Sequence, residues 1–209
     1  REELGHPSLT VNAHSTGGLI TALWANDRKD VSPLAGLVLN SPFLDLNAAP
    51  AVRTVGADVL NVVGHLKPYA VLPLGLNDLY GRSISAEHEG EWVFDVAWKP
   101  VEGVPVRAGW LGAVHRGHRR IHRGVDVGCP VLVLASTRSI VTKTWHEHLR
   151  SADAVLDVEH IARWSTSLGR HVTCVRIDGG LHDLVLSAAP VREKVYAEMS
   201  HWLAAYLPA

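Results

Sequence analysis

The feature that most constrains the fold is a series of short, continuously apolar segments separated by segments with helical spacing. Four have the composition of β-strands: residues 8–13 (LTVNAH), 36–40 (GLVLN), 130–136 (PVLVLAS) and 171–177 (HVTCVRI). They lack the polar alternation of strands that have one solvated face, so both faces are expected to be buried. Such strands, interspersed with helices, predict an α/β fold in which helices cover both faces of a mostly parallel sheet.

Three helices are predicted beside these strands. In the first, which follows residue 15, apolar side chains recur at helical spacing at Leu19, Ile20, Leu23 and Trp24. A second helix is expected over residues 158–169, because Gly169 is a typical C-terminal residue. A last helix is expected over residues 190–206, opened by Pro190.

The second and third strands are separated by residues 47–128, far more than one crossover helix of about 10–15 residues needs. This stretch is interpreted as a cap or lid, inserted into a core formed by residues 1–46 and 129–209. It contains helical pieces at 55–66 and 108–123 and a Pro/Leu-rich patch. The apolar residues 69–74 of that patch are compatible either with an acyl pocket or with plain packing of the cap on the core.

Composition excludes several classes of function. The 209 residues include 20 basic and 21 acidic side chains, so no charge excess favours nucleic acid or an anionic membrane. No segment approaches the run of about 20 apolar residues that a spanning helix needs. The sequence begins with Arg1 instead of Met, so targeting cannot be judged from this end, and a cytoplasmic location is the default expectation.

The first candidate for chemistry is Ser15, which lies where a strand ends and a helix begins (AHSTGG). A sharp strand-to-helix turn exposes a serine hydroxyl above the sheet edge, and small residues such as Ala13 and Gly17 relieve crowding there. The helix N-terminus that follows, starting at Thr16, offers amide groups to developing negative charge. The same pattern also fits a serine that only caps the helix.

The remaining parts of a serine-hydrolase triad follow in the expected order. A serine nucleophile needs an imidazole, and the imidazole needs a carboxylate to fix its tautomer. His182 follows the last predicted strand and the turn Gly179-Gly180, which places it at the carboxyl edge of the sheet. The acid is expected after the third strand, where Asp153 and Asp157 are both candidates.

In the stretches LTVNAHSTGGLI, GLVLNSPFLDL, CPVLVLAS, ADAVLDVEHIARW and GGLHDLVLS the chain resembles the α/β-hydrolase superfamily. Within it, the chain is similar to serine hydrolases of the lysophospholipase, monoacylglycerol lipase or serine aminopeptidase-like type. The resemblance implies Ser15 as nucleophile, His182 as general base and the Thr16 amide as one oxyanion donor. In such enzymes one variable and two apolar residues commonly follow the acid, which favours Asp153 and leaves Asp157 in reserve. The implied activity is hydrolysis of a small acyl ester without a cofactor, with cleavage of a peptide bond less favoured.

The chain also departs from the family pattern. The second oxyanion donor comes from a loop after an earlier strand, yet only fourteen residues precede Ser15. We therefore expect an N-terminal segment, or a second polypeptide, to complete the sheet. The alternative is a catalytically inert fragment or subunit that needs such a partner.

The thirteen histidines suggest a metal-dependent hydrolase as a further alternative. His115, His118 and His122 have helical spacing, and His146 and His148 flank a glutamate. Arginines crowd the first group and no carboxylate lies within it, so a solvated basic face is expected and no metal. His14 and Asp183, the neighbours of the two main candidates, are expected to be structural.

Overall fold

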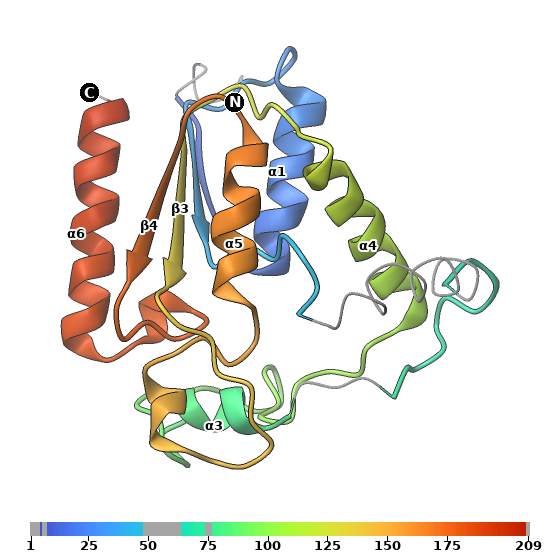
Figure 1. The fold of residues 1–209 in the computed structure, drawn as a ribbon, viewed down its shortest axis with the longest axis vertical. Helices are drawn as coiled ribbons and strands as arrows, with labels where there is room; N and C mark the ends of the chain where they lie inside the picture. Colours follow the sequence, from blue (N-terminus) through green and yellow to red (C-terminus); the bar gives the residue numbers. More distant parts are fainter. Residues whose placement is uncertain (1–4, 6–7, 48–63, 74–76, 208–209) are drawn as a thin grey trace.

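The computed structural model describes residue 5 and residues 8–47, 64–73 and 77–207. Its centre is a parallel sheet of four strands in the order β1-β2-β3-β4, each at the position that the sequence predicts. The strands are β1 (Thr10–His14), β2 (Gly36–Asn40), β3 (Val131–Ser136) and β4 (Val172–Ile177). All four point the same way, so their carboxyl ends meet at one edge of the sheet, at the bottom of Figure 1.

Helices cover both faces of the sheet, as predicted (Figure 1). Three of them lie on one face: α1 (Thr16–Arg28), α4 (Ala108–His122) and α5 (Val158–Ser165). The opposite face carries α6 (Ala189–Tyr206). The chain also forms three short 3-10 helices in its described part: η2 (Glu147–Arg150), η3 (Thr166–Leu168), which continues α5, and η4 (Leu184–Leu186).

The two apolar cores separate according to the alternation of side chains along the strands. Leu37, Leu39, Val131 and Val133 point to the cluster under α1, α4 and α5, which also contains Ile161. The alternate strand residues Val38, Leu132 and Leu134 point to the cluster under α6. This cluster also contains Val195 and Trp202 of α6. Strands β2 and β3 are buried along their whole length, which explains why their sequences carry no polar alternation.

The predicted insertion, residues 47–128, does not form a single layer. Helix α4 packs against α1, and its residues Val114 and Ile121 belong to the core cluster of the sheet. A shorter helix, α3 (Leu79–Ile84), lies beyond the carboxyl ends of the strands, at the bottom of Figure 1. The helical piece expected at 55–66 falls mainly outside the described residues.

The apolar patch is described over residues 69–73. Tyr69 and Val71 are exposed at the surface, with 79% and 59% of their residue area accessible to solvent. Within the described part of the chain, no helix combines the length and apolar character needed to cross a membrane.

Candidate active site

Ser15 lies at the predicted sharp turn from strand to helix, and its backbone there is strained. Ser15 directly follows β1, is the N-cap of α1 and has φ 52° and ψ −121°, a region that residues with a Cβ rarely adopt. Backbone hydrogen bonds hold it there: its amide donates to the carbonyl of Asn40, and its carbonyl accepts from the amide of Phe43. The end of β2 therefore fixes the turn that presents the Ser15 hydroxyl.

Steric crowding at this turn falls on a different glycine from the one expected. A Cβ atom at Gly18 would lie 2.8 Å from the Cβ of Pro42, too close for an unperturbed contact. A Cβ atom at Gly17 would meet nothing within 4 Å. The close approach that requires glycine is therefore between α1 and the segment after β2, at position 18.

His182 lies next to Ser15, on the loop that follows β4. Its Nε2 atom is 3.0 Å from the Ser15 Oγ atom, and the residue is almost completely buried. Its ring centroid is 4.8 Å from that of His14 and 5.4 Å from that of Tyr80. The imidazole is thus enclosed by aromatic rings and has little freedom to turn.

Of the two candidate acids, the structure brings Asp153 to His182. The Oδ2 atom of Asp153 is 3.0 Å from the Nδ1 atom of His182, and the Asp153 side chain is fully buried. Its other oxygen accepts hydrogen bonds of 2.8 Å from the amides of Val155 and Leu156. These bonds orient the carboxylate toward the imidazole.

Asp157 has a different place. It is the N-cap of α5, where its carboxylate accepts a hydrogen bond of 2.9 Å from the amide of Glu159. It also lies 3.6 Å from His160. Its role in the fold is to begin α5.

The side chain of Asn40 contacts the two residues that follow His182 in the chain. The side chain of Asn40 donates a hydrogen bond of 2.7 Å to Asp183 and accepts one of 3.2 Å from the amide of Leu184. The Nδ1 atom of His14 is 3.0 Å from the Asn40 carbonyl, and burial and the neighbouring His182 lower the pKa of His14. His14 and Asp183 therefore belong to the frame that holds the histidine loop against β2, as the sequence suggested.

The histidines of α4 do not form the solvated basic face that was expected. His115 and His118 are buried, whereas Arg116, Arg119 and Arg120 are exposed on the other side of the helix. The Nε2 atom of His118 donates to the carbonyl of Phe43 at 2.8 Å. His118 and His122 thus face the segment after β2, where the Phe43 and Leu44 carbonyls contact their Nε2 atoms.

His122 and the second histidine group also make local contacts. His122 contacts the Leu44 carbonyl at 2.9 Å and stacks on Trp164. The Nδ1 atom of His146 accepts from the amide of His148. Within the described ranges, no three His, Cys, Asp or Glu side chains are grouped so that they could hold a metal ion.

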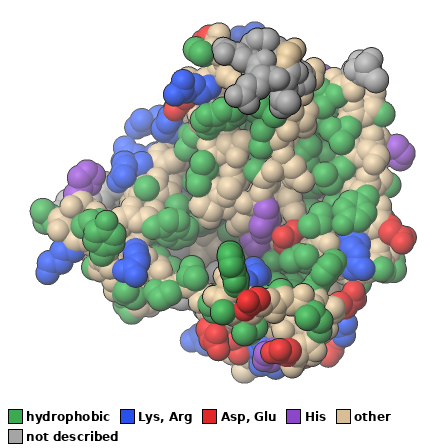
Figure 2. All heavy atoms as spheres, turned by 180° about the vertical axis from the view of Figure 1, so that it is seen from behind, with side chains coloured by type: hydrophobic (Ala, Val, Ile, Leu, Met, Phe, Trp, Pro, Cys, Tyr) green, Lys and Arg blue, Asp and Glu red, His purple; other side chains and the backbone are tan. Residues whose placement is uncertain are grey.

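The surface near the carboxyl ends of the strands is hollowed. Seen from behind, a depression lies above the lobe that contains α3, with a histidine side chain exposed beside it and apolar side chains around it (Figure 2). Sequence reasoning did not identify Asn40, Tyr80 or Trp92 as residues near the site. No short motif marks them, because each contacts His182 or its loop only through the fold.

Comparison with known proteins gives one family and a set of similar folds. The family model for serine aminopeptidases of group S33 matches residues 1–188. A search among curated proteins finds no significant match.

Solved structures share the fold at low sequence identity. The monoacylglycerol lipase of Paleococcus ferrophilus is 21% identical with a TM-score of 0.70, and the match covers 98% of this chain and 71% of the lipase. A monoglyceride lipase from Saccharomyces cerevisiae, crystallised with a substrate analogue, is 15% identical with a TM-score of 0.62, over 98% and 67% of the two chains. A thermostable carboxyl esterase from Bacillus coagulans is 14% identical with a TM-score of 0.55, again over 98% and 67%.

Proposed function

The chain belongs to the serine aminopeptidase S33 family of α/β-hydrolases, and on that premise we propose that it is a serine hydrolase of carboxylic esters. The observation that carries this proposal is the continuous chain of contacts from Ser15 Oγ to His182 Nε2 and from His182 Nδ1 to Asp153 Oδ2, each 3.0 Å long. A hydroxyl, an imidazole and a buried carboxylate in this order are what nucleophilic acyl transfer requires.

The proposed reaction proceeds through an acyl-enzyme. The Ser15 Oγ atom attacks the carbonyl carbon while His182 Nε2 takes its proton, and the Thr16 amide at the start of α1 donates to the developing oxyanion. The alcohol then leaves with the proton from His182. A water molecule, deprotonated by the same nitrogen, hydrolyses the acyl-enzyme, and Asp153 holds the imidazole tautomer throughout.

An ester with an apolar acyl chain, such as a monoacylglycerol or a lysophospholipid, is the favoured substrate class. Much of the exposed apolar surface lies in the part of the chain between β2 and α4, which contains Leu66, Tyr69, Val71, Val93, Val96, Trp98 and Val104 as exposed large side chains. An aminopeptidase needs a carboxylate for the substrate ammonium group. The two carboxylates beside His182, Asp153 and Asp183, already accept hydrogen bonds from other residues.

The proposal includes a strand that covers the free side of β1, supplied by another segment or a second chain. Among the described residues β1 pairs with β2 alone, so its other side presents unpaired amides and carbonyls. A cytoplasmic location also belongs to the proposal.

Labelling with a fluorophosphonate tests the nucleophile. We expect one equivalent of the probe on Ser15, and we expect Ser15→Ala to abolish both labelling and hydrolysis of p-nitrophenyl esters. Ser200→Ala, at an exposed serine on α6, is the matched control and should react like the parent protein. Unchanged hydrolysis in Ser15→Ala would refute the proposed function, and faster cleavage of an aminoacyl p-nitroanilide than of any ester would refute the substrate class.

A further inference from the structure

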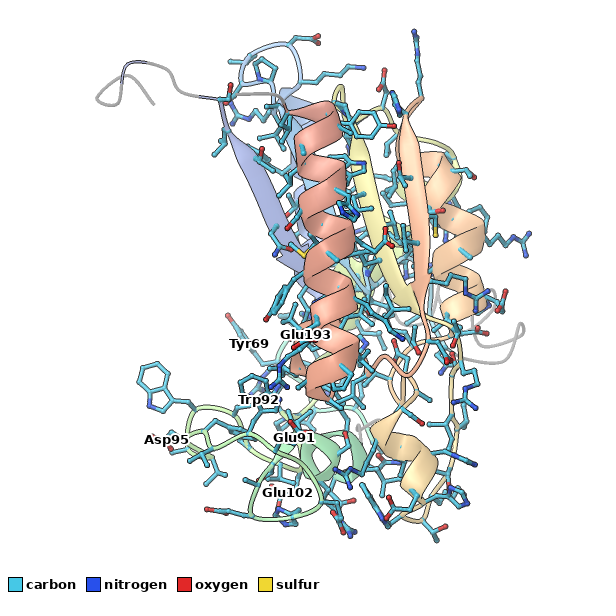
Figure 3. The ribbon with its side chains drawn as sticks, turned by 90° about the vertical axis from the view of Figure 1, so that its left-hand side faces the viewer. Tyr69, Glu91, Trp92, Asp95, Glu102 and Glu193 are labelled. Atoms are coloured by element: carbon cyan, nitrogen blue, oxygen red, sulfur yellow. The ribbon has the colours of Figure 1, made fainter. Side chains whose placement is uncertain are left out.

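The loop that carries His182 is contacted by the segment of residues 77–92, which contains α3. This segment lies beyond the carboxyl ends of the strands and meets the loop 181–187 near the start of α6 (Figure 3). Two of its side chains, Tyr80 and Trp92, contact the loop at its two ends. Neither residue belongs to the triad or to its sequence pattern.

Tyr80 contacts the imidazole and the peptide group that follows it. Its ring meets the His182 ring edge-to-face, with centroids 5.4 Å apart and planes at 82°. Its hydroxyl oxygen lies beside the backbone amide of Asp183, which lowers the pKa of Tyr80 by less than burial raises it. Burial raises the pKa of Tyr80 above its ordinary value, so the hydroxyl is neutral at physiological pH.

Trp92 contacts the far end of the same loop. Its indole Nε1 donates a hydrogen bond of 2.8 Å to the carbonyl of Leu186, in the 3-10 helix η4. The guanidinium of Arg192 lies over the Trp92 ring, 5.0 Å from its centroid, and also donates to the Ser187 carbonyl at 2.8 Å. Arg192 and Glu91 form an ion pair of 3.3 Å beside this contact, and Figure 3 shows Glu91 and Trp92 beneath the first turn of α6.

Hydrogen bonds within the segment join Tyr80 and Trp92 into one unit. The amide of Trp92 donates to the carbonyl of Ile84, at the end of α3, and the amide of Ala86 donates to the carbonyl of Trp92. Residues 84–92 therefore form a loop whose two ends are hydrogen-bonded to each other next to α3. A shift of this unit would move both contacts with the histidine loop together.

The same unit also contacts the segment that leads to Asp153. The guanidinium of Arg82 lies over the ring of Trp145, 5.2 Å from its centroid. The side chain of Asn77 donates a hydrogen bond of 3.2 Å to the carbonyl of Thr142. Both partners lie between β3 and Asp153, so residues 77–92 connect the loop of the acid with the loop of the base.

We propose that Tyr80 and Trp92 are positioning residues that hold the 181–187 loop so that the His182 imidazole stays between Ser15 and Asp153. In this role the segment 77–92 is a part of the catalytic frame as well as a cover over the site. The effect on catalysis rests on the proposed function, whereas the effect on the loop does not. An imidazole that turns away from the serine loses its function as a base, because proton transfer needs a heavy-atom separation of about 2.6–3.2 Å.

Two conservative variants with matched controls test this role. Tyr80→Phe keeps the ring and removes the hydroxyl that lies beside the Asp183 amide, and Trp92→Phe removes the donor to Leu186. Tyr196→Phe and Trp24→Phe make the same changes at exposed positions on α6 and α1, where the parent residues are 49% and 40% exposed. The measurements are the rate of fluorophosphonate labelling, kcat and KM for a p-nitrophenyl ester, and backbone hydrogen exchange of the peptide that spans 181–187.

We expect kcat and the labelling rate to fall about five- to tenfold in each test variant, the effect of losing one hydrogen bond that holds the reactive geometry. KM should stay within about twofold, because a positioning residue changes the fraction of competent enzyme and leaves ester binding unaltered. Exchange in 181–187 should accelerate, while both control variants behave like the parent protein. A rise in KM with unchanged kcat would instead make these residues part of the substrate pocket and overturn the proposal.

The outcomes separate this proposal from the proposed function. If the parent protein does not label at Ser15, the proposed function fails, and the exchange data alone then decide whether Tyr80 and Trp92 hold the loop. If labelling succeeds but rates and exchange in both test variants match the controls, the positioning role is refuted and the hydrolase assignment stands. Should Trp92→Phe fail to fold by circular dichroism, Tyr80→Phe decides the outcome, because it retains the packed ring.

Discussion

The Nε2 atom of His182 lies 3.0 Å from the Oγ atom of Ser15, although 167 positions separate the two residues in the chain. This proximity depends on the parallel sheet, because β1 ends directly before Ser15 and β4 ends shortly before His182, at the same edge. The separation is within the range for proton transfer from a serine hydroxyl to a general base. The carboxyl edge of the sheet therefore brings the two residues within reach of each other.

The two candidate acids can be separated by isosteric substitution. In Asp153→Asn the partner of His182 Nδ1 loses its charge, and we expect kcat for ester hydrolysis to fall about 10³–10⁴-fold. Asp157→Asn should keep at least half of the parent activity, since asparagine also caps helices well. Steady-state kinetics of both purified variants provide the test, and a larger loss in Asp157→Asn than in Asp153→Asn would contradict the assignment of the acid.

The neighbouring glycines at the start of α1 should respond in opposite directions to alanine. Gly18→Ala would place a Cβ atom 2.8 Å from Pro42, and we expect it to lower the free energy of unfolding by about 1–3 kcal/mol. Gly17→Ala has open space at a helical position and should be neutral or stabilising by up to about 1 kcal/mol. Urea denaturation of both variants measures the difference, and equal stabilities would show that Pro42 can move without cost.

Asn40 should stabilise the loop of His182 through both ends of its amide. In Asn40→Ala, the Asp183 carboxylate and the Leu184 amide lose buried partners, which we expect to cost about 2–3 kcal/mol of unfolding free energy. The exposed Asn47, whose amide makes only a long contact of 3.5 Å, supplies the control substitution Asn47→Ala. Chemical denaturation with both variants tests this, and a cost in Asn40→Ala no larger than in the control would contradict the assigned role.

Burial of His118 should make stability depend on pH. Its surroundings lower the pKa of His118 from 6.5 to about 4, because burial disfavours the imidazolium ion. The unfolded chain therefore binds a proton at higher pH than the folded chain does. The contribution of the neutral imidazole is complete above pH 6.5 and is lost as the pH falls from 6.5 to about 4, by about 3 kcal/mol in total.

Urea denaturation of the parent protein and of His118→Gln at pH 7.0 and pH 4.5 measures this effect. Glutamine does not titrate and retains a donor for the Phe43 carbonyl, so the variant should lose less stability than the parent protein between the two pH values. The protonated ring would also add a buried donor, since His118 Nδ1 has no hydrogen-bond partner among the described residues. An identical pH dependence of the two proteins would contradict this prediction.

Much of the fold followed from local patterns, and the remainder depended on contacts between distant segments. The continuous apolar runs predicted four strands because parallel strands bury both faces, and α5 and α6 begin within one residue of their predicted starts. The sequence did not place α4 against α1, since helical periodicity indicates an apolar face without naming its partner. The histidines of α4 were predicted to be solvated for the same reason. The adjacent arginines indicated a basic face, and the carbonyls that contact His118 and His122 come from the distant segment after β2.

The order of serine, acid and histidine and the strand-to-helix turn at Ser15 were readable in the sequence, because chain topology restricts them to a few positions, but the acid remained either Asp153 or Asp157. Tertiary structure decided which carboxylate meets the imidazole: Asp153 lies 3.0 Å from His182, while Asp157, four residues on, caps a helix. It also decided that Asn40, Tyr80 and Trp92 surround the histidine loop. Hydrogen bonds and ring contacts of this kind join residues far apart in the chain, and their geometry exists only once the sheet has brought its carboxyl ends together.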